Sequence, residues 1–206
     1  MARLLPLLLA LFAALAPVEV ASDTLRPLLP ALYRVVDVAA NDVLNIREAP
    51  DASSRIVGSL APDRRDVEVL DTSLQGNWAM IGEGEHSGWV ALRFLARQDE
   101  PIDNYGLPAT LRCVGAEPFY SFRFTNDGIA WSDPEGESLF ALAGMQSFLP
   151  DYDIRRDGLS FSFLRDGATV RAMIVPSICD DGMSDRLYGM RYIDDRLPHY
   201  GCCTLR

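Results

Sequence analysis

The sequence predicts an all-β protein built from two small domains. Three observations support this: short apolar runs divided by turn residues in the first half, alternating apolar and polar residues in the second, and a polar stretch between them. The polar stretch, residues 98–106, shows no hydrophobic period and is predicted to link a domain at 33–97 to a domain at 107–206. A first linker is predicted at residues 23–32, where Pro27 and Pro30 disfavour a helix.

The first 22 residues have the pattern of a signal peptide. Arg3 precedes an apolar run at residues 4–15, and Val20, Ala21 and Ser22 offer a cleavage site. An uncleaved anchor is the alternative, but the run is shorter than the roughly 20 residues that span a membrane. We therefore expect a periplasmic or secreted protein without a transmembrane span in the mature chain.

Charge restricts the classes of partner. The chain has 29 acidic and 19 basic residues, and its net charge is −10. A protein of this charge is repelled by nucleic acids and by anionic lipid surfaces. The composition therefore predicts no nucleic-acid partner, and it leaves the oligomeric state open.

The domain at 33–97 contains six short apolar runs separated by turn residues. They lie at residues 33–38, 43–46, 56–60, 67–70, 78–81 and 88–91. Many short strands with frequent turns are typical of a small barrel.

The domain at 107–206 shows the two-residue period of half-buried strands. Apolar residues alternate with polar ones around positions 120–124, 160–163 and 188–192, and turn sequences stand at 126–128 and 165–167. A further strand is expected at 170–175, ending before Pro176, while residues 139–145 fit either a strand or a short helix. An antiparallel barrel or sandwich is predicted.

Four cysteines, all in the second domain, are predicted to form disulfides, as is usual in exported proteins. They are Cys113, Cys179, Cys202 and Cys203. The last two are adjacent, and on a strand their side chains would point to opposite faces, so each is expected to take a different distant partner. Which partner each takes is left open. A zinc site is the alternative, but the spacing lacks paired C-x-x-C elements, and no metal is expected.

The first domain resembles the bacterial SH3 domain. The resemblance rests on Asn45-Ile46-Arg47 near the start and Gly88-Trp89-Val90 with Phe94-Leu95 near the end, over about 60 residues. It implies an SH3-like barrel with a shallow groove that recognises peptidoglycan peptide or an envelope protein.

Several residues of this domain are candidate ligand contacts. Arg47 either satisfies loop carbonyls, which we favour, or contacts the ligand, and Trp78 and Phe94 belong either to the core or to the rim of the groove. For Trp89 and Val90 we favour the core, because core aromatics bury large apolar areas without binding anything. His86 is interpreted as a solvated loop residue.

The second domain resembles an uncharacterised family of small exported or membrane-associated bacterial proteins. The resemblance rests on residues 113–120, residues 179–188 and Gly201-Cys202-Cys203, with Ala116 and Tyr120 departing from the family pattern of Thr and Trp. It implies a β-barrel with disulfides and no particular activity.

The acidic segment that begins at Asp180 has two interpretations. The favoured one is a structural turn in which Asp180 and Asp181 bond backbone N–H groups, with Ser184 capping the next turn. The alternative is a ligand pocket in which Glu117, Asp185 and Arg186 meet, with the guanidinium pairing one carboxylate. The spacing does not fit a calcium loop.

No catalytic residues and no organic cofactor are predicted, because the chain contains neither a G-x-S-x-G nor an H-E-x-x-H motif and no nucleotide loop. We expect an exported envelope-binding or adaptor protein rather than an enzyme. The main alternative is a regulator or inhibitor of a cell-wall hydrolase that uses the loop at 181–186, and a hydrolase is the third.

Overall fold

The computed structural model describes residues 28–146, 152–196 and 201–206. Within these residues the strands form one seven-stranded and one nine-stranded antiparallel sheet, which confirms the predicted all-β fold. The predicted signal peptide lies outside the described residues, as does the first half of the first linker, residues 23–27. No helix in the described ranges is long and apolar enough to cross a bilayer.

The first domain carries the seven-stranded sheet, in the order β3-β2-β6-β5-β4-β1-β7. Its strands are β1 (Ala31–Val35), β2 (Leu44–Arg47), β3 (Ile56–Leu60), β4 (Val67–Thr72), β5 (Trp78–Glu83), β6 (His86–Ala91) and β7 (Leu95–Arg97), with a 3-10 turn at Leu92–Phe94. The six predicted strands are present within a few residues. Two details differ: β1 begins inside the predicted linker, and β7 was not predicted.

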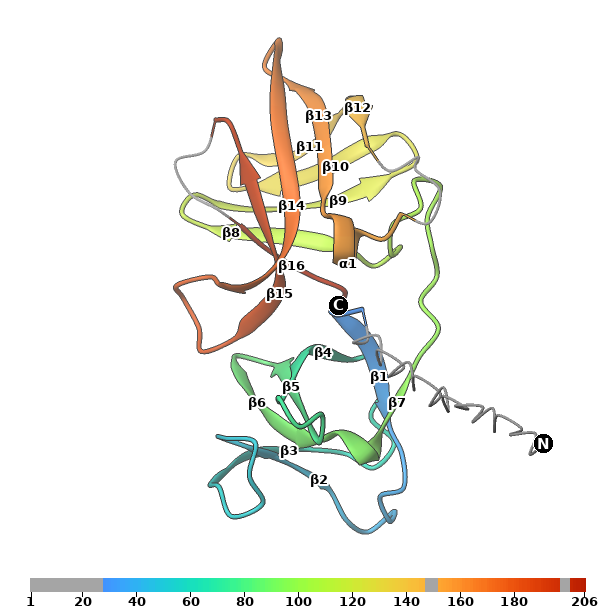
Figure 1. The fold of residues 1–206 in the computed structure, drawn as a ribbon. Helices are drawn as coiled ribbons and strands as arrows, with labels where there is room; N and C mark the ends of the chain where they lie inside the picture. The colour runs from blue at the N-terminus through green and yellow to red at the C-terminus, as the bar shows by residue number, and fades with distance from the viewer. Residues whose placement is uncertain (1–27, 147–151, 197–200) are drawn as a thin grey trace, which may run out of the picture.

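The second domain carries the nine-stranded sheet, in the order β11-β10-β9-β8-β16-β15-β14-β13-β12. Its strands are β8 (Arg112–Ala116), β9 (Phe119–Thr125), β10 (Gly128–Asp133), β11 (Gly136–Phe140), β12 (Leu142–Met145), β13 (Leu159–Arg165), β14 (Ala168–Asp180), β15 (Leu187–Asp194) and β16 (Gly201–Thr204). The sheet curls until β11 contacts β13, so it forms a nearly closed barrel (Figure 1).

Three local features of the second domain refine the sequence interpretation. Residues 139–145 belong to two strands, β11 and β12, and the short helix α1 (Ile154–Asp157) was not predicted. The strand expected to end before Pro176 continues to Asp180. The register of β14 against β15 shifts between Pro176 and Cys179, and proline is tolerated in a strand at such an irregularity.

The turn between β13 and β14 confirms the hairpin predicted at residues 165–167. Asp166 and Gly167 both have positive φ, at 52° and 75°. A two-residue hairpin turn of this kind requires positive φ at both central positions, which aspartate tolerates and glycine favours. The turn thereby sets the register that puts Phe161 and Phe163 on the inner face.

Aromatic side chains fill the core of the second domain. Trp131 stacks on Tyr120 with ring centroids 4.6 Å apart, and Tyr192 meets Phe122 edge-on at 4.7 Å. Such geometry adds stabilisation beyond the buried area alone.

The two domains meet across β1 and β4. On β1, Ala31, Tyr33 and Val35 face the first core, whereas Leu32 belongs to the second core. Leu32 pairs in register with Glu68 of β4, so both side chains leave the same outer face of the first domain. Both are buried because the second domain covers this face, and Figure 1 shows the chain's C-terminus at the same junction.

Glu68 is fully buried and hydrogen-bonded at this junction. One carboxylate oxygen accepts from the Thr204 hydroxyl, and the other accepts from the Leu205 backbone N–H at 2.8 Å. The Arg186 guanidinium lies 3.6 Å away. Burial raises the pKa of Glu68, while these three partners act in the opposite direction.

The predicted linker at 98–106 is also tied to both domains. Glu100 accepts from the Leu32 backbone N–H at 2.8 Å and forms an ion pair with Arg155 at 3.0 Å. Arg155 is held in turn by Asp153 at 2.6 Å. The linker is therefore part of the packed junction rather than a free tether.

A second ion-pair network predicts a pH effect. Glu83 of β5 pairs with Arg206 at 2.6 Å and with Arg64 at 2.8 Å. Burial alone would raise the pKa of Glu83, but the two arginines outweigh it and hold the pKa below its ordinary value of 4.5. Such a carboxylate stabilises the fold above pH 4.5, and the contribution is lost as the pH falls through the lower pKa of the folded state.

We therefore expect Glu83→Gln to lower the free energy of unfolding at pH 7 by about 1 kcal/mol or less, since the network is partly exposed. Below pH 4.5 the difference between variant and wild type should shrink, because glutamine does not titrate. Urea unfolding at a series of pH values measures it. A difference that stays constant down to pH 2 would contradict the assignment.

Candidate binding groove between the domains

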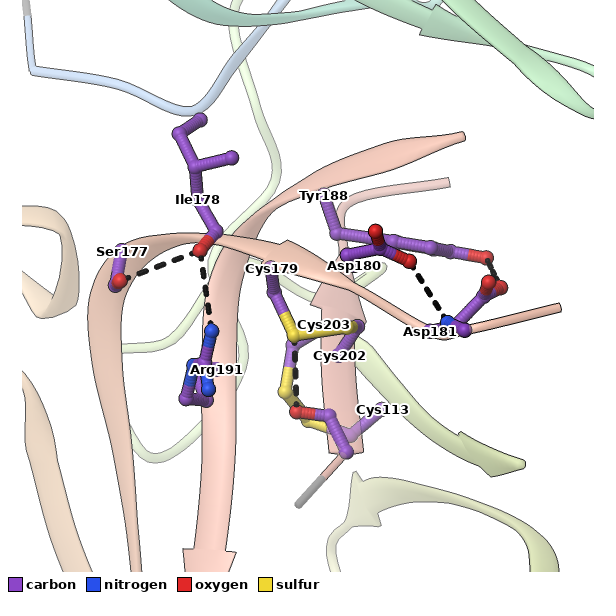
Figure 2. The surroundings of a disulfide bond; sticks show 12 residues. Cys113, Ser177, Ile178, Cys179, Asp180, Asp181, Tyr188, Arg191, Cys202 and Cys203 are labelled. Carbon is purple, nitrogen blue, oxygen red and sulfur yellow. Dashed lines mark hydrogen bonds between the residues drawn. A yellow bond between two sulfur atoms is a disulfide. The ribbon is translucent and has the colours of Figure 1, made fainter. Parts of the chain in front are cut away.

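Two disulfides crosslink the second domain. Cys113 is bonded to Cys203, and Cys179 to Cys202 (Figure 2). The adjacent cysteines of β16 do point to opposite faces, as predicted: Cys203 lies in the aromatic core, while Cys202 packs with Tyr188 in a separate small cluster. All four sulfurs are in disulfides, so none of these cysteines is a free thiolate.

The loop between β14 and β15 is a structured turn, which confirms the favoured interpretation. Asp180 accepts from the Gly182 N–H at 2.7 Å, and Asp181 accepts from the N–H groups of Met183 and Ser184 at 3.0 and 3.1 Å. The Tyr188 hydroxyl also donates to Asp181, at 3.0 Å (Figure 2). Burial would raise the pKa of Asp181, but these hydrogen bonds hold it below its ordinary value.

The end of this loop contacts the β5–β6 hairpin of the first domain. The Leu187 backbone N–H donates to the Ser87 hydroxyl at 2.6 Å, and Asp185 lies 3.6 Å from His86. A Cβ on Gly82 would approach the Leu187 carbonyl to 2.7 Å, so glycine is needed for this close contact. His86 is exposed as expected, but it begins strand β6 and faces the second domain instead of standing in a free loop.

A groove of about 330 Å³ lies where the loop meets the hairpin. The first domain contributes Glu48, Met80, Ser87, Gly88 and Trp89, and the second contributes Asp180, Ser184, Asp185 and Leu187. Trp89 pairs with Met80 across β5 and β6 and with Arg47 of β2. The groove thus has an apolar platform on one side and carboxylates on the other.

The expectation that Trp89 belongs to the core is wrong. Val90 is fully buried in the first core, as predicted, but Trp89 is half-buried, stands outside that core and lines the groove. Strand alternation explains the difference, because the side chain next to an inward-facing valine must point outward.

The other predicted contacts of the first domain lie elsewhere. Trp78 is half-buried, and Phe94 is half-buried and packs against the first core, where Arg93 stacks on its ring. Neither lines the groove. Arg47 donates to the Ser54 carbonyl at 2.6 Å, which confirms its favoured structural role.

The structure does not bring Glu117, Asp185 and Arg186 into one pocket. Arg186 contacts Glu68 and Thr204 at the junction and stacks over Tyr188. Asp185 lines the groove between the domains, whereas the exposed Glu117 borders a different hollow beside Asp181. The three residues therefore have three separate settings.

The groove carries negative charge next to its aromatic platform. Asp180 and Asp185 are exposed, and Glu48 is paired with the exposed Arg55 at 2.8 Å, which holds the pKa of Glu48 below its ordinary value. An aromatic face flanked by carboxylates suits a ligand with an amine. Across the described residues, no group of three or more acidic, histidine or cysteine side chains could hold a metal ion.

Sequence reasoning missed Met80, Glu48, Ser87 and Leu187. Met80 could have been found from strand alternation. It follows the inward-facing Ala79, so its own side chain points outward. The contribution of Ser87 and Leu187 depends on contact between domains, which no local pattern signals.

Comparison of the chain with family models, curated proteins and solved structures finds no match. The resemblance of the first domain to bacterial SH3 domains therefore stays a prediction. The function is inferred from the residues that line the groove.

Proposed function

We propose that this protein is an exported binding or adaptor protein of the cell envelope, and that its SH3-like first domain receives an amine-bearing peptidoglycan peptide, or a similar segment of an envelope protein. The observation that carries the proposal is Trp89, a large aromatic side chain outside the core that lines the groove between the domains. Half-buried tryptophans in grooves are typical hot spots of peptide binding.

Export is part of the proposal. The leader sequence favours it, and two disulfides are characteristic of proteins that fold in an oxidising compartment. The aromatic platform and the exposed Asp180 and Asp185 match a peptide with a free side-chain amine, such as the diamino acid of a wall stem peptide.

The alternative role as a hydrolase inhibitor has less support. It required the loop at 181–186 to protrude into an enzyme, but Arg186 at the end of this loop is engaged with Glu68, and Leu187 is bonded to Ser87.

Retention on purified sacculi tests the proposal. We expect Trp89→Ala in the full chain to weaken retention by on the order of tenfold or more, as removal of a hot-spot aromatic does. Trp78→Ala is the matched control, because Trp78 is a half-buried tryptophan of the same hairpin that does not line the groove. Point variants are preferable to truncation, since Leu32 belongs to the second core.

Equal retention of both variants and wild type would reject the groove as the site. A larger loss for Trp78→Ala than for Trp89→Ala would place binding on another face of the hairpin. Absence of retention for the wild-type chain would reject the wall as its ligand.

A further inference from the structure

Two arginines stand directly opposite each other on the outer face of the second domain. Arg112 of β8 and Arg123 of β9 are register partners, while their neighbours Cys113 and Phe122 face the core. Partners of this kind have Cβ atoms about 5 Å apart. Both arginines are exposed, and in the part of the chain that the structure describes neither guanidinium group forms a hydrogen bond or ion pair.

This pairing is unfavourable on its own. Like charges directly opposite each other in a sheet are destabilising. Acidic residues are abundant in a chain with 29 of them, and other exposed arginines of the second domain do have partners, such as Arg171 with Asp195 at 3.6 Å. Glu137 lines the same groove but forms an ion pair with neither arginine, so the pair is left open to a negative charge from outside the described chain.

The arginines form one wall of a groove of about 540 Å³. Its floor carries small residues in two neighbouring rows: Ala130 lies in register between Arg123 and Leu139, and Ser121 and Ser132 form the next row, which leads to Glu137. The opposite wall carries Leu139, a residue that is 58% exposed, and Glu137. Small residues between long ones make this surface hollow.

We propose that this groove binds the carboxylate end of a short peptide. Two guanidinium groups side by side match the planar geometry of a carboxylate, and the serine hydroxyls supply further donors. The groove crosses from β8 to β11, three strand spacings or roughly 14 Å, which accommodates about four extended residues. Leu139 provides the apolar contact for a side chain.

This site goes beyond the proposed function and is independent of it, because the groove at Trp89 involves none of the same residues. The protein would then hold an amine-bearing segment at the junction and a free carboxylate end on the second domain. An adaptor that joins two peptides requires two such sites.

The test is calorimetric titration of the full chain with tetra-alanine as the free acid and as its C-terminal amide. We expect the acid to bind at least about tenfold more tightly than the amide, because the charged hydrogen bonds are lost with the carboxylate. Arg112→Gln and Arg123→Gln should each remove this preference. Arg171→Gln, a compensated arginine of the same domain, should retain it.

The thermal stability of the arginine variants provides a second readout. If the pair exists to bind an anion, Arg123→Gln leaves the melting temperature unchanged or raises it, because repulsion is relieved. A marked fall in melting temperature would assign the arginines a structural role and overturn the proposal. Equal affinity for acid and amide, binding retained in both variants, or tighter binding of inorganic phosphate than of the peptide would also overturn it.

Discussion

Replacing Cys113 and Cys203 together by alanine is expected to lower the free energy of unfolding by about 4–5 kcal/mol. The bond joins residues 90 apart in sequence, and the constraint that a crosslink places on the unfolded chain grows with the length of the loop it closes. Alanine is the appropriate replacement because both positions are fully buried, where serine would add an unsatisfied hydroxyl.

The second disulfide provides the matched comparison. Cys179 and Cys202 are 23 residues apart, so their replacement by alanine should cost about 3 kcal/mol. Urea unfolding of the two double variants and the wild type, without reductant, measures both values. A larger loss for the Cys179–Cys202 pair would contradict the loop-length argument.

Glu68→Ala is expected to destabilise the protein by about 3–5 kcal/mol. The variant leaves the Leu205 N–H and the Thr204 hydroxyl without their buried acceptor and Arg186 without its carboxylate. Removal of one member of a buried charged network has a cost of this size because the remaining groups stay desolvated. The Leu205 N–H should also become less protected from hydrogen exchange.

Glu68→Gln is the control for shape. Glutamine can still accept from Leu205 and donate to Thr204, and it resembles the protonated carboxyl that burial favours. We expect it to lose much less stability than Glu68→Ala. Equal losses in the two variants would show that the hydrogen bonds at this junction contribute little.

Local patterns in the sequence predict the strands well, because alternation and turn chemistry act over a few residues. The hairpin at Asp166-Gly167 and the opposite orientation of Cys202 and Cys203 follow from such rules and are confirmed. The end predicted at Pro176 is wrong, since a register shift in β14 accommodates the proline.

Contacts between the domains could not be predicted in this way. By alternation Glu68 is an outward-facing charge on β4, and only the second domain turns that position into a buried one. The same contact determines that Arg186 is engaged at the junction and that Asp185 borders the groove. Trp89 is different. It is adjacent to the inward-facing Val90 on one strand, so alternation alone indicates that it faces outward.

Binding of an envelope peptide between the domains at Trp89 can be followed directly in solution. The most direct measurement is an NMR titration of the ¹⁵N-labelled full chain with a soluble wall stem peptide, following the indole N–H signals of its three tryptophans, Trp78, Trp89 and Trp131. We expect the Trp89 signal and the backbone signals of residues 184–187 to shift together, while the signal of Trp131 in the second core does not move. Shifts confined to Trp78, or no shift at Trp89 at saturating peptide, would contradict binding between the domains.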